Sequence, residues 1–484
     1  MKVRMILLAQ AAGRFMDRYR VLLGTLLAAA FAGLLAIYNV SSGPLRNLND
    51  IGGWGNRALF IVMSAAVHGA ALLLCACMSR VRFPRLALRQ VIVTAGFYIM
   101  LLGINHKTYH YINIVQPLVR AMDEGGLAAG AAMGANLSAP ALLVTYLITR
   151  GPIYDMYLLK LFAIAGYLVL ALLITRFADR RKLGIRSEVL LALCMILPQG
   201  FTNAACSAVM DVFAAALLGV SLALAFDTDR PRMDVSALCY GAACAMSGAC
   251  LCALPAYVVL AAKGGMKKRC LPAAAGVMIV LCIPAMIAGM HPAQALGSLF
   301  NANFGLPAYA SGAPGLMNLV PRALVEEMPQ YAPILRHFEA LDTVTHAQPY
   351  YTQAHFTQMA SGMILVSLAL AMGMWALMLR MKDKPVLHRL LTLALGLMIA
   401  CPNTTSGAWL IVDLLCLYAL LAASPLRIPA CMVLFATACS GVYPMTEEVM
   451  LPMIYAFGLC LLALLMLTGV IPMNQEDGKE KAHE

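Results

Sequence analysis

The stretch Leu197-Pro198-Gln199-Gly200-Phe201-Thr202-Asn203-Ala204-Ala205-Cys206-Ser207-Ala208-Val209-Met210-Asp211 is a polar corner, broken by proline, between two apolar runs. The run before it, residues 189–197, is shorter than the roughly 20 residues that cross a bilayer, whereas residues 204–226 are long enough. The pattern predicts a helix-turn-helix near one bilayer face, with Asp211 about two turns down the second helix. A carboxylate at that depth costs about 2.5–3.5 kcal/mol unless it faces protein or water. Asp211 is therefore either a functional acid or a buried cap or helix-pairing residue.

The composition is that of a membrane protein. Of the 484 residues, 62% are hydrophobic and 12% are charged, against about 45–50% and 25% in soluble proteins. The net charge of +12 resides mostly in short segments between apolar runs, where membrane orientation explains it and no nucleic-acid partner is predicted. The 15 cysteines lie almost entirely in apolar runs, which predicts neither a disulfide framework nor a zinc cluster.

The lysines and arginines orient the predicted spans. By the positive-inside rule, the basic segments are cytoplasmic, which puts both termini inside and the long polar segments outside. We predict an all-α, multi-pass protein of the cell membrane with about 14 transmembrane helices, within a range of about 11 to 14. The cytoplasmic basic segments are 79–90, 176–187, 263–269 and 380–389, and the outer segments are 41–57, 105–153 and 291–357.

Three segments depart from simple spans. Residues 139–148 are too short to cross and predict an interfacial or re-entrant helix. Residues 235–262 are flanked at both ends by charged segments that are predicted to be cytoplasmic. The run must therefore enter and leave on the same side, which predicts two short helices that meet near Ser247. Residues 291–357 are the longest polar segment and predict a soluble outer cap.

Polar groups from the outer segments predict a site for a lipid-borne or extracytoplasmic substrate, since no phosphate-loop, paired-glycine or zinc-protease motif occurs. Lys160 lies inside an apolar span, where it either snorkels outward or binds the phosphate of a lipid-linked donor. Six outer histidines match no ligand spacing, so no metal or other cofactor is predicted and a divalent metal has no sequence support. The predicted substrate-binding residues are Lys160, Gln199, Asn203, Asn301, Asn318, Arg322 and Asp413.

Motif spacings suggest a family. The segments 125–128, 139–149 and 152–161 look like the stretch after a first catalytic loop, 197–211 has the spacing of an L-P-T…N-S-A-x-W-G-Q-x-D element, and 402–413 has that of L-P-x-M-H-E-R-Y…A-D. Over residues 105–423 the chain thus resembles the bacterial membrane mannosyltransferases related to the enzyme that adds the second mannose to GPI anchors. These enzymes have the C-type glycosyltransferase fold.

The catalytic motifs of that family are eroded in this chain. Ser207-Ala208-Val209 stands where the family has W-G-Q, and Thr404 to Ala408 stands where it has M-H-E-R-Y. Ile104-Asn105-His106 stands at the S-G-D motif that carries the family's general base. Of the charged elements only Asp211 and Asp413 remain. The chain is interpreted as a divergent member.

Hydropathy, charge and the resemblance together predict three parts: N-terminal transmembrane helices at 1–104, a glycosyltransferase-like transmembrane domain at 105–471 with outer loops and short interfacial helices, and a cytoplasmic tail at 472–484. The resemblance also implies transfer of a hexose, mannose-like, from a polyprenyl-phosphate sugar to an extracytoplasmic or lipid-linked acceptor. One carboxylate would deprotonate the acceptor hydroxyl. The candidate catalytic residues are Asp211, which has the family spacing, and His106 and Asp50, which match no motif.

Two other functions stay open. A catalytically silent relative would bind a lipid-linked glycan or act as a partner subunit. A transporter or flippase is disfavoured because such proteins usually carry internal repeats and helices broken at the midplane, whereas no half of this chain resembles the other.

Overall fold

A computed structural model describes most of the chain. The described residues are 13–46, 48, 53–108, 111–132, 137–207, 211–226, 232–254, 257–258, 267, 269–304, 314–315, 384–400, 406–407, 409–441 and 451–472, with parts of 365–381. Among them every regular element is a helix, as the sequence predicts, and no strand occurs.

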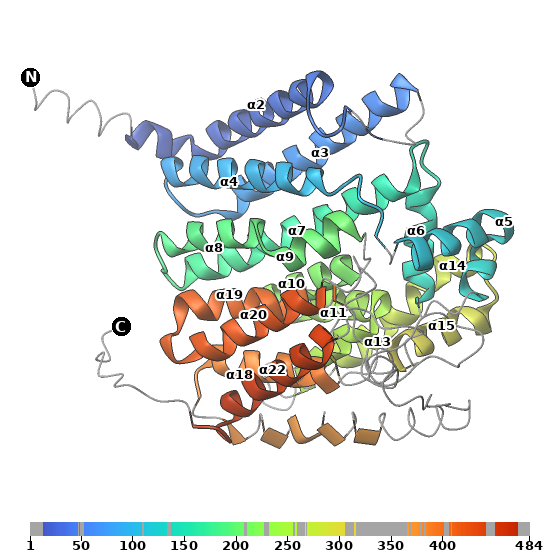
Figure 1. Ribbon diagram of the computed structural model, residues 1–484, viewed down its shortest axis with the longest axis vertical. Coiled ribbons are helices and arrows are strands. Elements are labelled where there is room, and N and C mark those ends of the chain that lie inside the picture. The colour runs from blue at the N-terminus through green and yellow to red at the C-terminus, as the bar shows by residue number, and fades with distance from the viewer. Residues whose placement is uncertain are drawn as a thin grey trace, which may run out of the picture.

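The N-terminal half packs its long helices side by side. Helices α2, α3 and α4 form one group, and α7 and α8 pack against α4 (Figure 1). Short helices α5 and α6 lie at the end of the bundle where α7 begins. The elements are α2 (Arg20–Ser41), α3 (Trp54–Met78), α4 (Phe83–Leu102), η1 (Tyr111–Val115), α5 (Gln116–Ala132), α6 (Ala139–Thr149), α7 (Asp155–Arg180), α8 (Arg186–Met195), α9 (Pro198–Gly200) and η2 (Phe201–Cys206).

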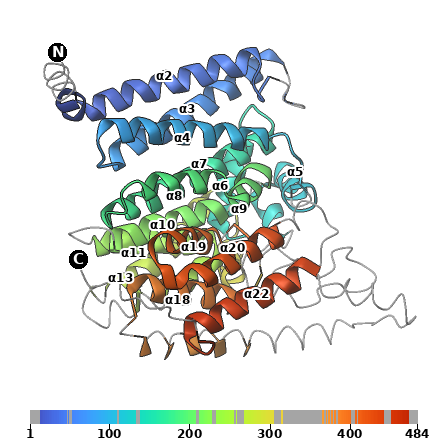
Figure 2. The same ribbon diagram turned by 60° about the vertical axis from the view of Figure 1, so that its left-hand side comes forward.

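The C-terminal half continues the bundle on the other side of α7. Figures 1 and 2 show α10, α11, α19 and α20 stacked below α7 and α8, followed by α18 and α22. Its elements are α10 (Asp211–Phe226), α11 (Met233–Met246), η3 (Gly248–Ala253), α13 (Cys270–Val280), α14 (Ile283–Ile287), α15 (Pro292–Phe304), α18 (Val386–Ala400), α19 (Leu410–Ala422), η5 (Ser424–Leu426), α20 (Arg427–Gly441) and α22 (Leu451–Thr468).

Several helices are suited to a membrane. Within the described part of the chain, five are long and apolar enough to cross one: α2, α3, α4, α7 and the α13–α14 pair. A sixth span results if α8 and the α9–η2 segment count as one, bent by 43°. Further apolar helices of 10–17 residues fill the rest of the bundle. The prediction of a helical membrane protein is supported at this level.

Local sequence patterns predicted two features of the helices correctly. Residues 139–148 form the separate short helix α6, which begins after an N-cap at Ser138 whose side chain accepts from the Ala141 amide. The break predicted near Ser247 is present, because Ser247 is extended between α11 and η3.

The first part of the outer segment 105–153, expected from its composition to be a polar loop, is instead largely helical where it is described. It contains η1 and α5, whose buried residues include Leu118, Val119 and Met122. Their one-sided spacing packs α5 on the bundle, and Gly126, at φ 70°, kinks the helix where an L side chain would be strained. Three glycines and the charged residues Arg120, Asp123 and Glu124 within α5 explain why composition alone suggested a loop.

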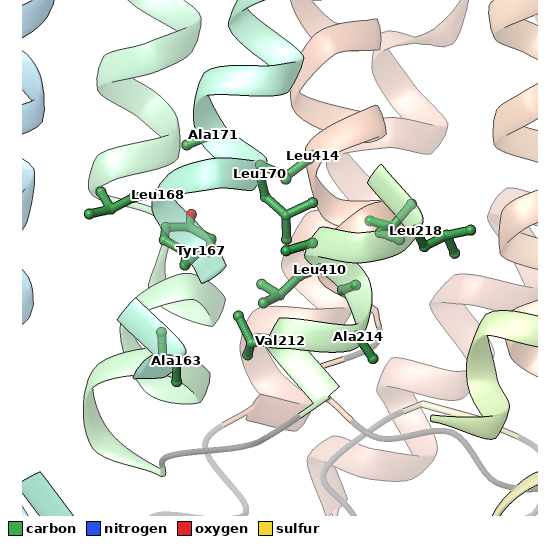
Figure 3. Packing of buried hydrophobic residues seen from close by; sticks show 14 of the residues in the cluster. Ala163, Tyr167, Leu168, Leu170, Ala171, Val212, Ala214, Leu218, Leu410 and Leu414 are labelled. Atoms are coloured by element: carbon green, nitrogen blue, oxygen red, sulfur yellow. The ribbon is translucent and has the colours of Figure 1, made fainter. Parts of the chain in front are cut away.

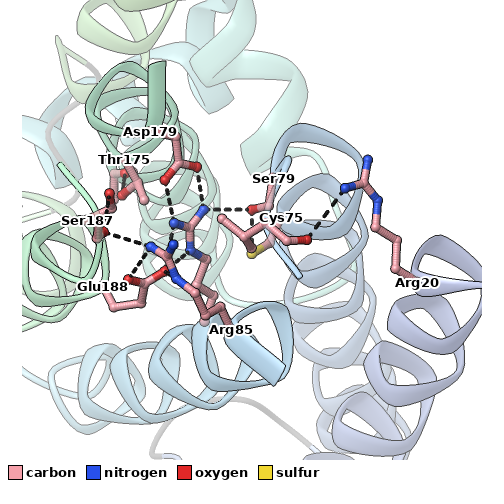
Figure 4. A network of polar contacts seen from close by, with 12 residues as sticks. Arg20, Cys75, Ser79, Arg85, Thr175, Asp179, Ser187 and Glu188 are labelled. Carbon is pink, nitrogen blue, oxygen red and sulfur yellow. Dashed lines mark hydrogen bonds and ion pairs between the residues drawn. The ribbon is translucent and has the colours of Figure 1, made fainter. Parts of the chain in front are cut away.

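Segment 79–90 also differs from the predicted loop, because α4 already begins at Phe83, with Pro84 in its first turn. Arg89 is thereby carried into the bundle and is 1% exposed. Its guanidinium donates to Asp179 at 2.5 and 2.6 Å and to Glu188 at 2.8 Å. Arg85 donates to the same Glu188 at 2.7 and 3.0 Å (Figure 4).

This ion-pair network connects α4 to the end of α7 and the start of α8, on either side of the turn between them. We call the end of the bundle that carries this turn the basic end, and the end that carries α5, α6 and the first residue of α7 the distal end. The two ends place different chemistry at opposite termini of α7.

Candidate functional site

The distal end gathers aromatic and polar side chains from three segments. We call Asn105, Lys107, Tyr111, Tyr154, Asp155 and Tyr157 the distal cluster. Tyr111 donates its phenol proton to Asp155 Oδ1 at 3.1 Å, and the Met156 amide donates to the same oxygen at 2.8 Å. Tyr157 donates to Asn105 Oδ1 at 2.7 Å.

The aromatic rings of the distal cluster contact each other. The Tyr154 ring meets those of Tyr111 and Tyr157 edge-on, with centroids 6.4 and 5.4 Å apart. The Lys107 ammonium lies 5.7 Å from the centre of the Tyr154 ring. Burial, with Tyr154 and Asp155 beside it, raises the pKa of the Tyr111 phenol. The phenol therefore stays protonated at neutral pH and remains a donor to Asp155.

Lys160 lies beneath this cluster, one and a half turns into α7, and is 0% exposed. Its ammonium donates to the carbonyl oxygens of Gly103 at 3.3 Å and Ile104 at 2.9 Å, and also to that of His106. These carbonyls follow the end of α4, where backbone acceptors lack helical partners. Lys160 thus neither snorkels outward nor points at solvent, and it fixes the backbone that carries Asn105 and Lys107.

Lys160→Met should therefore lower the free energy of unfolding by about 1–3 kcal/mol, because buried carbonyl oxygens lose their hydrogen-bond donor. Unfolding of the purified protein by denaturant would measure the loss. Leu161→Met, at the next position of the same helix, is the matched control with no change in hydrogen bonding. A Lys160→Met protein as stable as this control would contradict the capping role.

A second polar group is buried at the predicted corner. Gln199 Nε2 donates to Thr437 Oγ1 at 2.7 Å, and Thr437 donates to Asp413 Oδ1 at 2.6 Å. Asn203 Nδ2 donates to the Gln199 carbonyl at 2.8 Å, and Ser406 donates to Asn203 Oδ1 at 2.5 Å. This corner network joins α9 and η2 to α19 and α20.

The corner network contains buried atoms without partners. Within the described part of the chain, Asp413 Oδ2 and Gln199 Oε1 have none, and neither has the indole nitrogen of Trp409, one turn before Asp413. Asp413 is 0% exposed and Gln199 is 3% exposed. A buried carboxyl without a cation is costly, so groups of this kind mark candidates for binding a proton, an ion or a polar substrate.

The element η2 carries Asn203 of the corner network and also contacts α7, the helix that begins in the distal cluster. One side of η2 packs on the end of α4, where a Cβ on Gly103 would lie 2.9 Å from the Phe201 ring and 3.1 Å from Ala205. At Gly200 the chain passes so close to Tyr167 that a Cβ would meet the ring at 2.2 Å. Both glycines are needed for close packing of the corner.

The structure locates the predicted catalytic residues as follows. Asp211 is the first residue of α10 and is half-buried, so it is not two turns inside that helix. Of the residues expected to form its first turns, 204–206 instead belong to the π-helix η2, and 208–210 lie outside the described residues. His106 follows α4 at the distal end with an exposed side chain. Asp50 lies outside the described residues.

The predicted substrate-binding residues fall into three groups. Gln199, Asn203 and Asp413 come together in the corner network, and Lys160 is bound to backbone carbonyls. Asn301 lies in α15 with its side chain outside the description, and Asn318 and Arg322 lie outside the described residues.

Asp155 and its tyrosine partners are the residues that the site prediction omitted. An aspartate in the first turn of a helix is ordinary, since it complements the helix dipole, so position alone did not distinguish it. The run of Tyr154, Asp155 and Tyr157 at the start of an apolar span was the available signal. Comparison with protein-family models, curated proteins and solved structures found no match to this chain.

Proposed function

We propose that the chain is a multi-pass membrane hexosyltransferase that takes its sugar from a polyprenyl phosphate at the distal end. In this proposal the distal end faces outward, the basic end and both termini are cytoplasmic, and the short apolar helices complete a bundle of about 14 spans with the C-type glycosyltransferase arrangement. The acceptor is an extracytoplasmic or lipid-linked hydroxyl compound.

The observation that carries the proposal is the distal cluster. It combines a carboxylate, an amide and three phenol rings at the end of a membrane-suited helix. Carboxylate and amide groups hydrogen-bond sugar hydroxyls, and aromatic rings supply apolar contact surface with a polar edge. The Lys107 ammonium adds a charge suited to a phosphate.

Within this cluster, we assign the general-base role to Asp155. Its carboxylate is oriented by two donors, the Tyr111 phenol and the Met156 amide. The resemblance instead pointed to Asp211, and His106 and Asp50 were weighed as bases without a motif. Asp155 supports the role better because its neighbours form a polar and aromatic surface at the helix end.

The test is mass spectrometry of lipids that co-purify with the detergent-solubilised protein. We expect a polyprenyl-phosphate hexose, retained by the wild-type chain and reduced in Tyr154→Ala. Tyr98→Ala, which alters a tyrosine on α4 that hydrogen-bonds Tyr38, is the control. A wild-type protein that retains no lipid-linked sugar, even after incubation with one, would contradict the proposal. Retention without any transfer would favour the silent lipid-glycan-binding relative.

The corner network favours a second candidate, ion-coupled transport. Transporters place ions at helices that are broken within the membrane. Here the α8 to η2 segment is bent by 43° and carries Gln199 and Asn203 against the buried Asp413. The test is sodium- or proton-dependent uptake of a polar solute by proteoliposomes that contain the protein. Uptake that is abolished by Asp413→Asn would favour transport over glycosyl transfer.

A further inference from the structure

An elongated cavity of about 400 Å³ lies between α7, α10, α18 and α19. One wall includes Leu170, Leu218 and Leu414, which come from three of these helices and pack around the same space (Figure 3). From Leu170 to Arg181 the cavity follows α7 for roughly 16 Å, given the rise of about 1.5 Å per residue. An apolar volume that extends this far along the helices suits a hydrocarbon chain better than a compact solute.

The polar groups of the cavity lie at the basic end. Among its described lining residues, Arg181 carries the only charge, and the Tyr418 phenol is the only other polar side chain. The Arg181 guanidinium stacks 5.6 Å from the centre of the Phe177 ring, and that ring lies 5.2 Å from the Tyr418 ring. The cavity is thus apolar along its length and cationic at one end.

Within the described part of the chain, no carboxylate lies at ion-pair distance from Arg181, whereas Arg85 and Arg89 bind Asp179 and Glu188. Two further arginines stand at the adjoining end of α19, where Arg186 donates to the Leu421 carbonyl at 3.3 Å and Arg427 to that of Leu420 at 3.2 Å. The rim of the cavity therefore favours an anion.

We propose that this cavity binds an anionic glycerophospholipid, with one acyl chain between α7, α10 and α19 and the phosphate at Arg181. Basic pockets between transmembrane helices bind anionic headgroups in this way. The site is at the opposite end of α7 from the distal cluster, so it is separate from the sugar site and does not depend on the proposed transfer reaction. It depends only on the bundle lying in a bilayer.

Native mass spectrometry of the delipidated full-length protein tests the site. We expect phosphatidylglycerol to bind roughly tenfold more tightly than phosphatidylcholine with the same acyl chains, because both carry a phosphate but the choline cation of phosphatidylcholine cancels that charge beside the arginines of the rim. Arg181→Gln should remove most of this preference, and Arg181→Lys should retain it. Ala223→Phe, which places a ring in the cavity, should weaken both lipids.

The matched control is Arg82→Gln, which removes an exposed arginine before α4, a helix that does not line the cavity. The proposal fails if this control loses as much preference as Arg181→Gln, or if the wild-type protein binds the two lipids equally. Stronger binding of a polyprenyl phosphate than of phosphatidylglycerol at the same cavity would overturn the assignment to a glycerophospholipid.

Discussion

Arg89→Met should lower the free energy of unfolding by about 3–5 kcal/mol, the usual cost of removing one partner from a buried ion pair. Arg89 is 1% exposed and forms ion pairs with both Asp179 and Glu188. In this variant Glu188 would keep its ion pair with Arg85. Asp179, which is only 14% exposed, would lose both of the hydrogen bonds that it accepts from the Arg89 guanidinium. Denaturant titration of the purified protein in micelles would measure the change.

The control is Arg82→Met, because Arg82 precedes the same helix and is exposed. A double variant, Arg89→Met with Asp179→Leu, should recover part of the loss, since replacing both members of a buried pair by apolar groups is often nearly neutral. Equal stability of Arg89→Met and Arg82→Met would show that the network contributes little.

Asp155→Asn should reduce sugar transfer by about 10²- to 10⁴-fold, the usual contribution of a general base. The amide keeps the shape of the carboxyl group but cannot accept the acceptor's proton. The rate would be followed as hexose moved from a polyprenyl-phosphate donor in detergent solution. This prediction rests on the proposed function, so donor binding should be measured in the same samples.

Asp123→Asn is the matched control for Asp155. Asp123 is 52% exposed and pairs with Arg150 at 3.6 Å, a surface contact worth less than about 1 kcal/mol. Its loss should change the rate little. If both variants transfer at the wild-type rate, then Asp155 is a helix-capping residue and the base lies elsewhere.

Hydropathy predicted many of the helices because it is a local property. The apolar runs 21–40, 428–444 and 451–471 are each expected to form one span, and the bounds of α2, α20 and α22 lie within a few residues of them. Asp211 was misplaced for a local reason as well. Pro198 starts a short turn and the chain then forms a π-helix, so the regular α-helix begins later than an apolar run suggests.

The site was harder to predict because its contacts join distant parts of the chain. Gln199 and Asn203 were singled out at the corner, but their bonds to Thr437 and Ser406 span more than 200 residues. The bond from Tyr111 to Asp155 likewise required η1 and α5, which composition gave as a loop. Their contacts appear only once the helices are packed.

The arginine network also constrains the order in which the protein is made. Asp179 and Glu188 lie 90 and 99 residues beyond Arg89, so at about 5–20 residues per second the ribosome adds them roughly 5 to 20 seconds later. Until then an arginine on a newly inserted helix must keep its charge at the membrane surface. If the bundle lies in a membrane, α4 can reach its final position only after α7 and α8 have been synthesised, so the placement of α4 depends on the middle of the chain.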